Sequence, residues 1–230
     1  MTETRDIDER ASAPTSRRGP ATWQVVVLVV ALCFLAGVVG WWLNQPSDEG
    51  FSDVDVGFLS DMETHHNGAI ALGFSYLARE NDPLVGHFAR EIIVSQAQEI
   101  GAMNNYLNRA GVPPSAVDDV AMDWMGHPVR PADMPGMPTA AESARLDAAQ
   151  GLAADDEFTR LMIRHHAAGS AMAAYAAEHG EHAGVRRFAA AMARAQRSEI
   201  NEVNNRRAAL GLDEVSRAEI REIERLHTGT

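Results

Sequence analysis

The sequence is short of cysteine, lysine and aromatic residues. Cys33 is the only cysteine among 230 residues, which excludes an intramolecular disulfide and a cysteine-based zinc site. All 20 basic residues are arginine, which we attribute to the base composition of a GC-rich genome rather than to a mechanism. Aromatic residues make up 6% of the chain and hydrophobic residues 46%, which favours alanine-rich helix packing over a β-sandwich.

Positive charge is also scarce, because 20 basic residues face 32 acidic ones and leave a net charge of −12. Nonspecific nucleic-acid binding needs a basic face, so nucleic acid is not an expected partner. The sequence also lacks a serine–histidine–aspartate nucleophile pattern and a phosphate-binding glycine loop. An acidic surface, in contrast, attracts cations.

One long apolar run, WQVVVLVVALCFLAGVVGWWL at residues 23–43, contains no charge. A membrane-spanning helix needs about 20 apolar residues. Arg17 and Arg18 precede the run and acidic residues follow it, so the positive-inside rule predicts a single-pass membrane protein with a cytoplasmic N-terminus. Residues 1–22 are then a disordered cytoplasmic tail, residues 44–52 a tether, and the remainder is extracytoplasmic. A cleaved signal peptide is the alternative.

The rest of the chain contains the same helical hairpin twice, 100 residues apart. The first copy reads FLSDMETHHNGAIAL from Phe58, and the second reads FTRLMIRHHAAGSAM from Phe158. Helix-core spacing is easily shared by two copies of one fold unit, but a double histidine and a Gln/Glu pair are not required by it. The matched polar residues therefore point toward function: His65, His66, Gln96 and Glu99, paired with His165, His166, Gln196 and Glu199.

Periodicity and capping signals predict four long helices, at residues 53–79, 83–110, 155–179 and 182–210. A linker at residues 111–138 joins the two hairpins, 53–110 and 139–212, and a capping box at Thr139 opens the second hairpin with a short helix. Neither hairpin can bury its apolar stripe alone, so we expect an all-α four-helix bundle over residues 53–212. A short charged helix follows at residues 213–230.

The polar residues of each hairpin fall on its inward face. At about 100° per residue, His65 and His66 straddle the centre of the apolar stripe, while Gln96 and Glu99 lie within the stripe of the partner helix. Burying an unpaired carboxylate is costly, so these groups need a proton, an ion pair or a metal. The alternative to a metal site is a buried His–Glu–Gln network that fixes helix register.

The linker is rich in methionine, reading MDWMGHPVRPADMPGM at residues 122–137. A loop has no core to fill, so packing alone accounts poorly for these side chains. Thioether and imidazole together favour copper, with methionine suited to Cu(I) and histidine to either oxidation state. The alternative is a loop draped over an apolar bundle end. The possible loop ligands are Met122, Met125, His127, Met134 and Met137.

A di-iron carboxylate enzyme is the enzymatic alternative, and the sequence argues against it. Such bundles use Glu-x-x-His on two helices. Glu63-Thr64-His65-His66 fits once, but Ile163 stands at the matching position of the second copy, and Glu63 falls off the core face. We therefore expect no catalytic residues.

The two His-His motifs, with QAQEI and QRSEI in the following helices, resemble a bacterial family named domain of unknown function 305. The resemblance covers roughly residues 55–210. It implies a ferritin-like helical bundle that is secreted or membrane-anchored, and some relatives are implicated in copper binding or copper resistance. Two departures matter here: Leu72 stands where the second copy has Met172, and Val203 stands where the first copy has Met103. Either the copies complete one shared site, or one copy has weakened.

We therefore predict a membrane-anchored, extracytoplasmic bundle that binds copper, as Cu(I) or Cu(II), for storage, delivery or tolerance. Its partners would be the metal ion, the bilayer through residues 23–43, and a membrane cuproenzyme or a second copy of the chain. The alternative is a metal-free helical interaction module or accessory subunit of a membrane complex; a redox-active di-metal enzyme ranks third. The candidate metal ligands are His65, His66, His165, His166, Met62, Met103, Met162, Met172, Glu99 and Glu199, with Gln96 and Gln196 orienting the imidazoles.

Overall fold

The computed structural model describes residues 50–112 and 120–225. The predicted tail at 1–22 and membrane-spanning run at 23–43 lie outside these residues, as does the predicted tether up to residue 49. Among the helices of the described part, none is long and apolar enough to cross a membrane.

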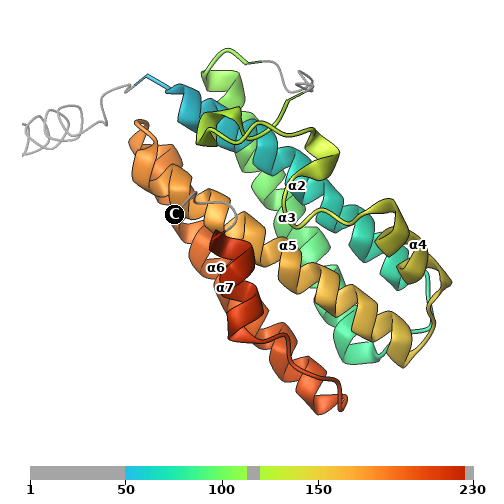
Figure 1. The fold of residues 1–230 in the computed structure, drawn as a ribbon. Coiled ribbons are helices and arrows are strands. Elements are labelled where there is room, and N and C mark those ends of the chain that lie inside the picture. The colour runs from blue at the N-terminus through green and yellow to red at the C-terminus, as the bar shows by residue number, and fades with distance from the viewer. Residues whose placement is uncertain (1–49, 113–119, 226–230) are drawn as a thin grey trace, which may run out of the picture. The chain divides into compact units, whose positions relative to one another are not determined.

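The described secondary structure is helical apart from one isolated bridge between Ala121 and Val129. Four long helices form two hairpins, and shorter helices lie in the connection and after the second hairpin (Figure 1). The long helices are α2 (Asp53–Leu77), α3 (Pro83–Arg109), α5 (Leu152–His179) and α6 (Ala183–Ala209); the shorter ones are α4 (Ala140–Ala148), α7 (Arg217–Arg225) and the 3₁₀ turns η1 (Asp123–Met125) and η2 (Pro131–Asp133).

Local capping chemistry sets where the helices begin. The Ser52 side chain and the Asp55 carboxylate form a capping box at the start of α2, and Thr139 does the same with Glu142 at α4. Asp82 caps α3 and places Pro83 at the first helical turn. The predicted bounds of α2, α3 and α6 are confirmed to within two residues, whereas α5 begins at Leu152, three residues earlier than predicted.

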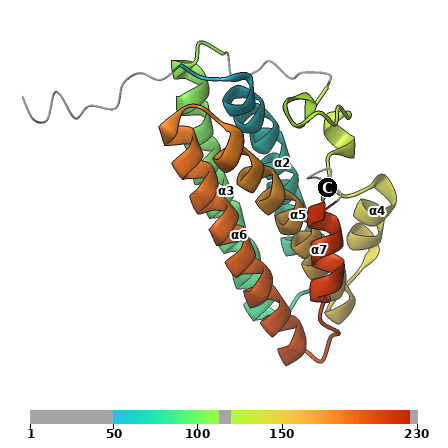
Figure 2. The same ribbon diagram turned by 60° about the vertical axis from the view of Figure 1, so that its left-hand side comes forward.

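The two hairpins pack through α2 and α5, which run antiparallel. Tyr76 near the end of α2 stacks on Phe158 near the start of α5, with ring centroids 4.2 Å apart and an interplanar angle of 11°. Figure 2 shows the α5–α6 hairpin against the α2–α3 hairpin. The predicted all-α bundle of two repeated hairpins is confirmed. Because α2 and α5 are equivalent helices of the two copies and pack antiparallel, the copies are related by an approximate twofold axis across the middle of the bundle.

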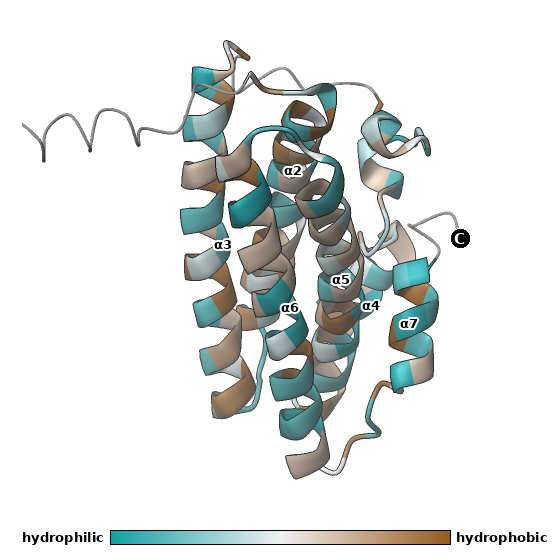
Figure 3. Ribbon diagram, turned by 90° about the vertical axis from the view of Figure 1, so that its left-hand side faces the viewer, coloured by the Kyte–Doolittle hydropathy of each residue, from teal (hydrophilic) through white to brown (hydrophobic). Residues whose placement is uncertain are grey.

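The apolar faces of the long helices are turned toward one another (Figure 3). They form two buried clusters, one toward each end of the bundle. Tyr76, Phe88 and Phe158 belong to one cluster, and Phe58, Leu59 and Met62 to the other. The middle of the bundle, between these clusters, holds the polar residues that the sequence singled out.

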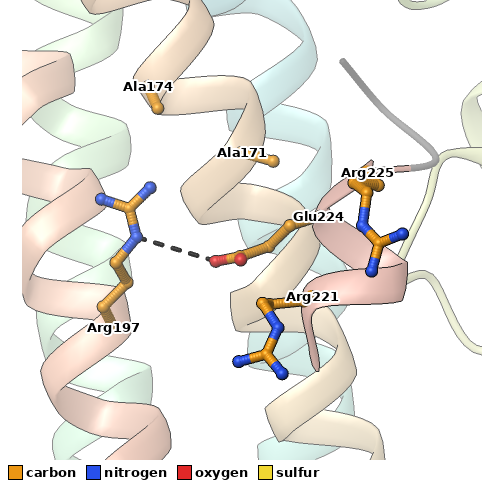
Figure 4. A pocket seen from close by; sticks show the side chains of 6 residues that line it. All are labelled: Ala171, Ala174, Arg197, Arg221, Glu224 and Arg225. Carbon is orange, nitrogen blue, oxygen red and sulfur yellow. Dashed lines mark ion pairs between the residues drawn. The ribbon is translucent and has the colours of Figure 1, made fainter. Parts of the chain in front are cut away.

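The C-terminal helix α7 is charged but packs on α5, with Ile220 and Ile223 against the core. A surface pocket of about 300 Å³ lies between α5, α6 and α7. Figure 4 shows Arg197 of α6 reaching toward Glu224 of α7 across it, and their charged atoms are 3.7 Å apart. The remaining lining residues are Ala171, Ala174, Arg221 and Arg225, so this pocket is separate from the histidines.

Candidate metal centre

The four paired histidines are buried in the middle of the bundle, with at most 1% of each exposed. His65 of α2 and His165 of α5 stack on each other across the approximate twofold axis, with ring centroids 3.7 Å apart at 29°. His66 and His166 lie to either side, with centroids 6.5 Å and 5.9 Å from their chain neighbours. The antiparallel packing therefore brings both pairs together at one level of the bundle.

The hydrogen bonds of the inner pair fix their tautomers. The Nε2 atom of His165 lies 2.8 Å from the His65 carbonyl oxygen, and Nε2 of His65 lies 3.0 Å from the Pro135 carbonyl oxygen. A carbonyl only accepts, so both Nε2 atoms carry the proton. Burial, with the neighbouring His65 and His166, holds the pKa of His165 well below its usual value, so its ring is neutral. Its Nδ1 then presents a lone pair, the form that binds a metal, and nothing in the described residues hydrogen-bonds to it.

Each outer histidine pairs with the glutamate of its own hairpin. Nε2 of His66 lies 2.7 Å from Glu99 Oε2, and Nε2 of His166 lies 2.7 Å from Glu199 Oε2. Each glutamate side chain is 27% exposed, so the predicted inward carboxylates lie at the edge of the core. His166 Nδ1 donates to the Met162 carbonyl oxygen at 2.9 Å, and His166 Nε2 has no hydrogen-bond partner among the described residues. The Nε2 lone pair of His166 and the Glu199 carboxylate therefore face each other, and both are groups that can bind a cation.

Two buried glutamines add to the unsatisfied polar atoms. Gln96 and Gln196 are each 2% exposed, and neither end of either amide has a partner among the described residues. A Cβ at Gly169 would lie 2.5 Å from Gln196 Oε1, so the Gln196 amide packs directly against α5 at this glycine. An unsatisfied buried polar group costs ~1–3 kcal/mol. The residues around the histidines thus fit a polar guest such as a metal ion or ordered water.

The two ends of the bundle differ in their methionine content. In the cluster at the Phe58 end lie four core methionines, two from each hairpin: Met62, Met103, Met172 and Met192. Their counterparts across the approximate twofold axis lie in the other cluster and are Met162, Val203, Leu72 and Ile92. One end of the bundle is therefore rich in thioethers, whereas the cluster at the other end combines aliphatic and aromatic residues with a single methionine, Met162.

The linker covers the methionine-rich end. Met122, Met125 and Met134 are at most 6% exposed and belong to the same cluster, and Met137 packs against it. The argument that a loop has no core to fill was wrong for these residues, because the loop itself completes the core. His127 is exposed, so the structure separates it from the buried methionines.

The predicted ligands do not form a single centre. Within the described residues, no three His, Asp or Glu side chains converge as a metal site. Met162 lies in the cluster that contains Phe158, apart from the other predicted core methionines. Glu63 accepts a hydrogen bond from the Asn104 side chain at 3.4 Å.

Two residues were missed by the sequence reasoning. Met192 is buried on the inward face of α6 but was not among the predicted ligands. Asp61 is a carboxylate, 9% exposed, whose counterpart in the second copy is the buried Leu161. The replacement of a buried leucine by aspartate at equivalent positions of the two copies was the sequence signal that could have identified Asp61.

Comparison with known proteins adds the family. The model of DUF305, a domain of unknown function, matches residues 55–207. The chain belongs to this family. A DUF305 protein from Streptomyces coelicolor described as secreted is 32% identical with a TM-score of 0.64, covering 71% of this chain and 97% of that one. A DUF305 fragment from Deinococcus radiodurans is 31% identical with a TM-score of 0.58, covering 68% and 96%.

A third structure, CopM in its Cu(I)-bound form, is 25% identical to the chain with a TM-score of 0.50, covering 68% of this chain and 96% of that one. No curated protein matches the chain. The DUF305 match spans both hairpins and the linker, so the duplicated His-His hairpin is the family's domain in this chain.

Proposed function

We propose that this DUF305 protein is a membrane-anchored, extracytoplasmic copper-binding bundle that stores or delivers copper or supports copper tolerance. The observation that carries the proposal is the gathering of Met62, Met103, Met172 and Met192 at one end of the bundle, next to a buried histidine. Two hairpins contribute equally to that end, so the methionines missing from each copy are supplied by the other.

Helical spacing relates these thioethers to the His66–Glu99 pair. Met62 lies one turn before His66 on α2, and Met103 lies one turn after Glu99 on α3. Glu99 orients the His66 ring through their 2.7 Å contact, as second-sphere carboxylates do in metal sites. Soft thioether and imidazole ligands suit Cu(I), whereas the lone pairs of His165 and His166 suit either copper oxidation state.

The relatives support the same reading. CopM was solved with Cu(I) bound, and the Streptomyces coelicolor protein is described as secreted. The acidic chain favours a cationic ligand. The apolar run at residues 23–43 supports the anchor, with the bundle outside the cytoplasm.

Metal content of the full chain, purified in detergent, tests the proposal. After incubation with Cu(I), Cu(II), Zn(II) or Fe(II) and desalting, we expect copper to be retained at one or more ions per chain. Replacing His65, His66, His165 and His166 by Leu should abolish that retention while circular dichroism shows intact helices.

Retention of no metal would instead favour a metal-free interaction module. In that case the same His-to-Leu replacements should be neutral or stabilising, because a buried polar network often gives way to apolar groups without loss. Chemical denaturation of the quadruple variant separates the two outcomes.

A further inference from the structure

Residues 120–138, here named the strap, cross the methionine-rich end and the central histidines. One carboxylate fastens its first part to α2. Asp61 Oδ2 accepts a hydrogen bond from the Met122 backbone N–H at 2.6 Å and another from Trp124 Nε1 at 2.7 Å. Both bonds are charge-assisted and therefore stronger than bonds between neutral groups.

The strap fits the bundle closely at three glycines. A Cβ at Gly57 would lie 2.4 Å from the Trp124 ring, and a Cβ at Gly68 would lie 2.7 Å from the Met137 sulfur. Gly136, within the strap, has φ +79°, and a Cβ there would lie 2.8 Å from the His165 Cα. Glycines occur on both sides of the contact, in α2 and in the strap, so the backbone of each side fits closely against the other.

The strap lies over residues to which the proposed function assigns copper binding. The Pro135 carbonyl oxygen accepts the hydrogen bond from His65 Nε2 at 3.0 Å, and Met134 covers the methionine cluster. The strap contacts the inner pair directly, through Pro135 at His65 and through Gly136 beside His165, and both of these histidines are fully buried.

The strap is held by its buried methionines and has little regular secondary structure of its own. Its regular structure is limited to two 3₁₀ turns and the Ala121–Val129 bridge. Met122 has φ +64°, a left-handed conformation that costs a non-glycine residue free energy, and its N–H is held by Asp61. Segments with few regular hydrogen bonds open at lower free energy than core helices.

We infer that the strap is a cover that opens as a unit while the helices stay folded, and that Asp61 is its latch. Asp61 is then a positioning residue that sets how fast metal enters and leaves the bundle. The effect of Asp61 on metal entry and exit rests on the proposed function, whereas the opening of the strap does not.

Hydrogen exchange of the metal-free protein tests the opening. In Asp61→Asn the amides of Ala121 and Val129, which pair across the bridge, should exchange about tenfold faster or more, since losing charge-assisted bonds shifts equilibria by at least that factor. The amides of α3 and α6 should keep their rates. Asp147→Asn is the matched control, because Asp147 also accepts two side-chain bonds, from Ser75 and Arg79, but outside the strap. Equal exchange of strap amides in Asp61→Asn and wild type, or a parallel rise in the helices, overturns the inference.

Copper transfer tests the consequence. With Cu(I) supplied by, and withdrawn to, a chromogenic chelator, Asp61→Asn should load and release about tenfold faster, with the amount bound at equilibrium changed much less. Faster release without faster loading would make Asp61 an affinity determinant and overturn its role as a latch. If wild type takes up no copper, the proposed function fails, and hydrogen exchange still decides whether the strap opens as a unit.

Discussion

His165 is a titratable group held where water cannot solvate its charged form. Burial lowers its pKa well below 6.5 in the folded protein. As the pH falls below 6.5, His165 therefore binds a proton in the unfolded chain before it does so in the folded protein. Below about pH 6.5 the free energy of unfolding should therefore fall with falling pH, by up to ~1.4 kcal/mol per unit from this group, and it should be level above that pH. Urea unfolding of the metal-free protein from pH 7.5 to 5 measures the slope.

The variant that isolates this effect is His165→Gln, which removes the titration. Its slope below pH 6.5 should be flatter than that of wild type. His87→Gln serves as the control, because the His87 side chain is 66% exposed and should leave the slope unchanged. An unaltered slope in His165→Gln would assign the acid sensitivity to other groups.

Gly136 and Gly126 share a backbone conformation but not an environment. Their φ angles are +79° and +77°, yet a Cβ would strike the His165 and Arg164 backbone at Gly136 and would meet nothing within 4 Å at Gly126. Gly126→Ala should cost only the left-handed strain, ~1–2 kcal/mol. Gly136→Ala should cost ~1–3 kcal/mol more, from overpacking. Denaturant midpoints of the two variants measure the difference in the free energy of unfolding. Equal losses of stability would mean that the strap does not pack closely against α5 at Gly136.

At the scale of elements, the twofold packing of the hairpins lets each residue at one bundle end be compared with the residue at the equivalent position of the other end. Met103, Met172 and Met192 lie opposite Val203, Leu72 and Ile92, so the fold already accepts the aliphatic residue in each environment. Exchanging each methionine for its counterpart (Met103→Val, Met172→Leu, Met192→Ile) should keep the helices and remove the Cu(I) retained by the chain. Elemental analysis and circular dichroism check both halves of that expectation.

The reverse exchange is the sharper test. Leu72→Met, Ile92→Met and Val203→Met, added to the native Met162, would give the methionine-poor end the same four thioethers. Because methionine is flexible and fills core gaps readily, the bundle should fold. The retained Cu(I) should rise by about one ion per chain if thioethers beside a His–Glu pair suffice. An unchanged stoichiometry would show that the strap, which covers only the native end, is also required.

The sequence predicted the elements well because their signals are local. Ser52, Asp82 and Thr139 are capping residues whose hydrogen bonds span three residues, so the helix starts follow from short stretches of chain. The face of each helix follows from its periodicity in the same way, which is why the four histidines were correctly expected to be inward. Which methionines share an end depends on the antiparallel packing of α2 and α5, and no local pattern encodes that choice.

Over the whole chain, the two hairpins and the strap form one interdependent core. The strap's Met122, Met125 and Met134 are buried only because both hairpins supply the surface beneath them, so their role could not be read from a loop sequence alone. The same dependence explains why the predicted ligand set was divided: Met162 was grouped with Met172 by sequence, but the fold places them in different clusters.

Placement of the chain in the cell is a whole-molecule property that depends on residues 23–43. If this run is an uncleaved anchor, the full chain should remain with membranes after an alkaline carbonate wash, and its mass should include the N-terminus. Leu32→Arg puts a charge at the centre of the run, which costs ~2.5–3.5 kcal/mol on insertion scales, and should shift protein to the wash. Leu43→Arg, at the end of the run, is the control and should stay bound, because a terminal arginine can reach the membrane surface. Recovery of a soluble protein that begins after residue 43 would identify the run as a cleaved signal peptide.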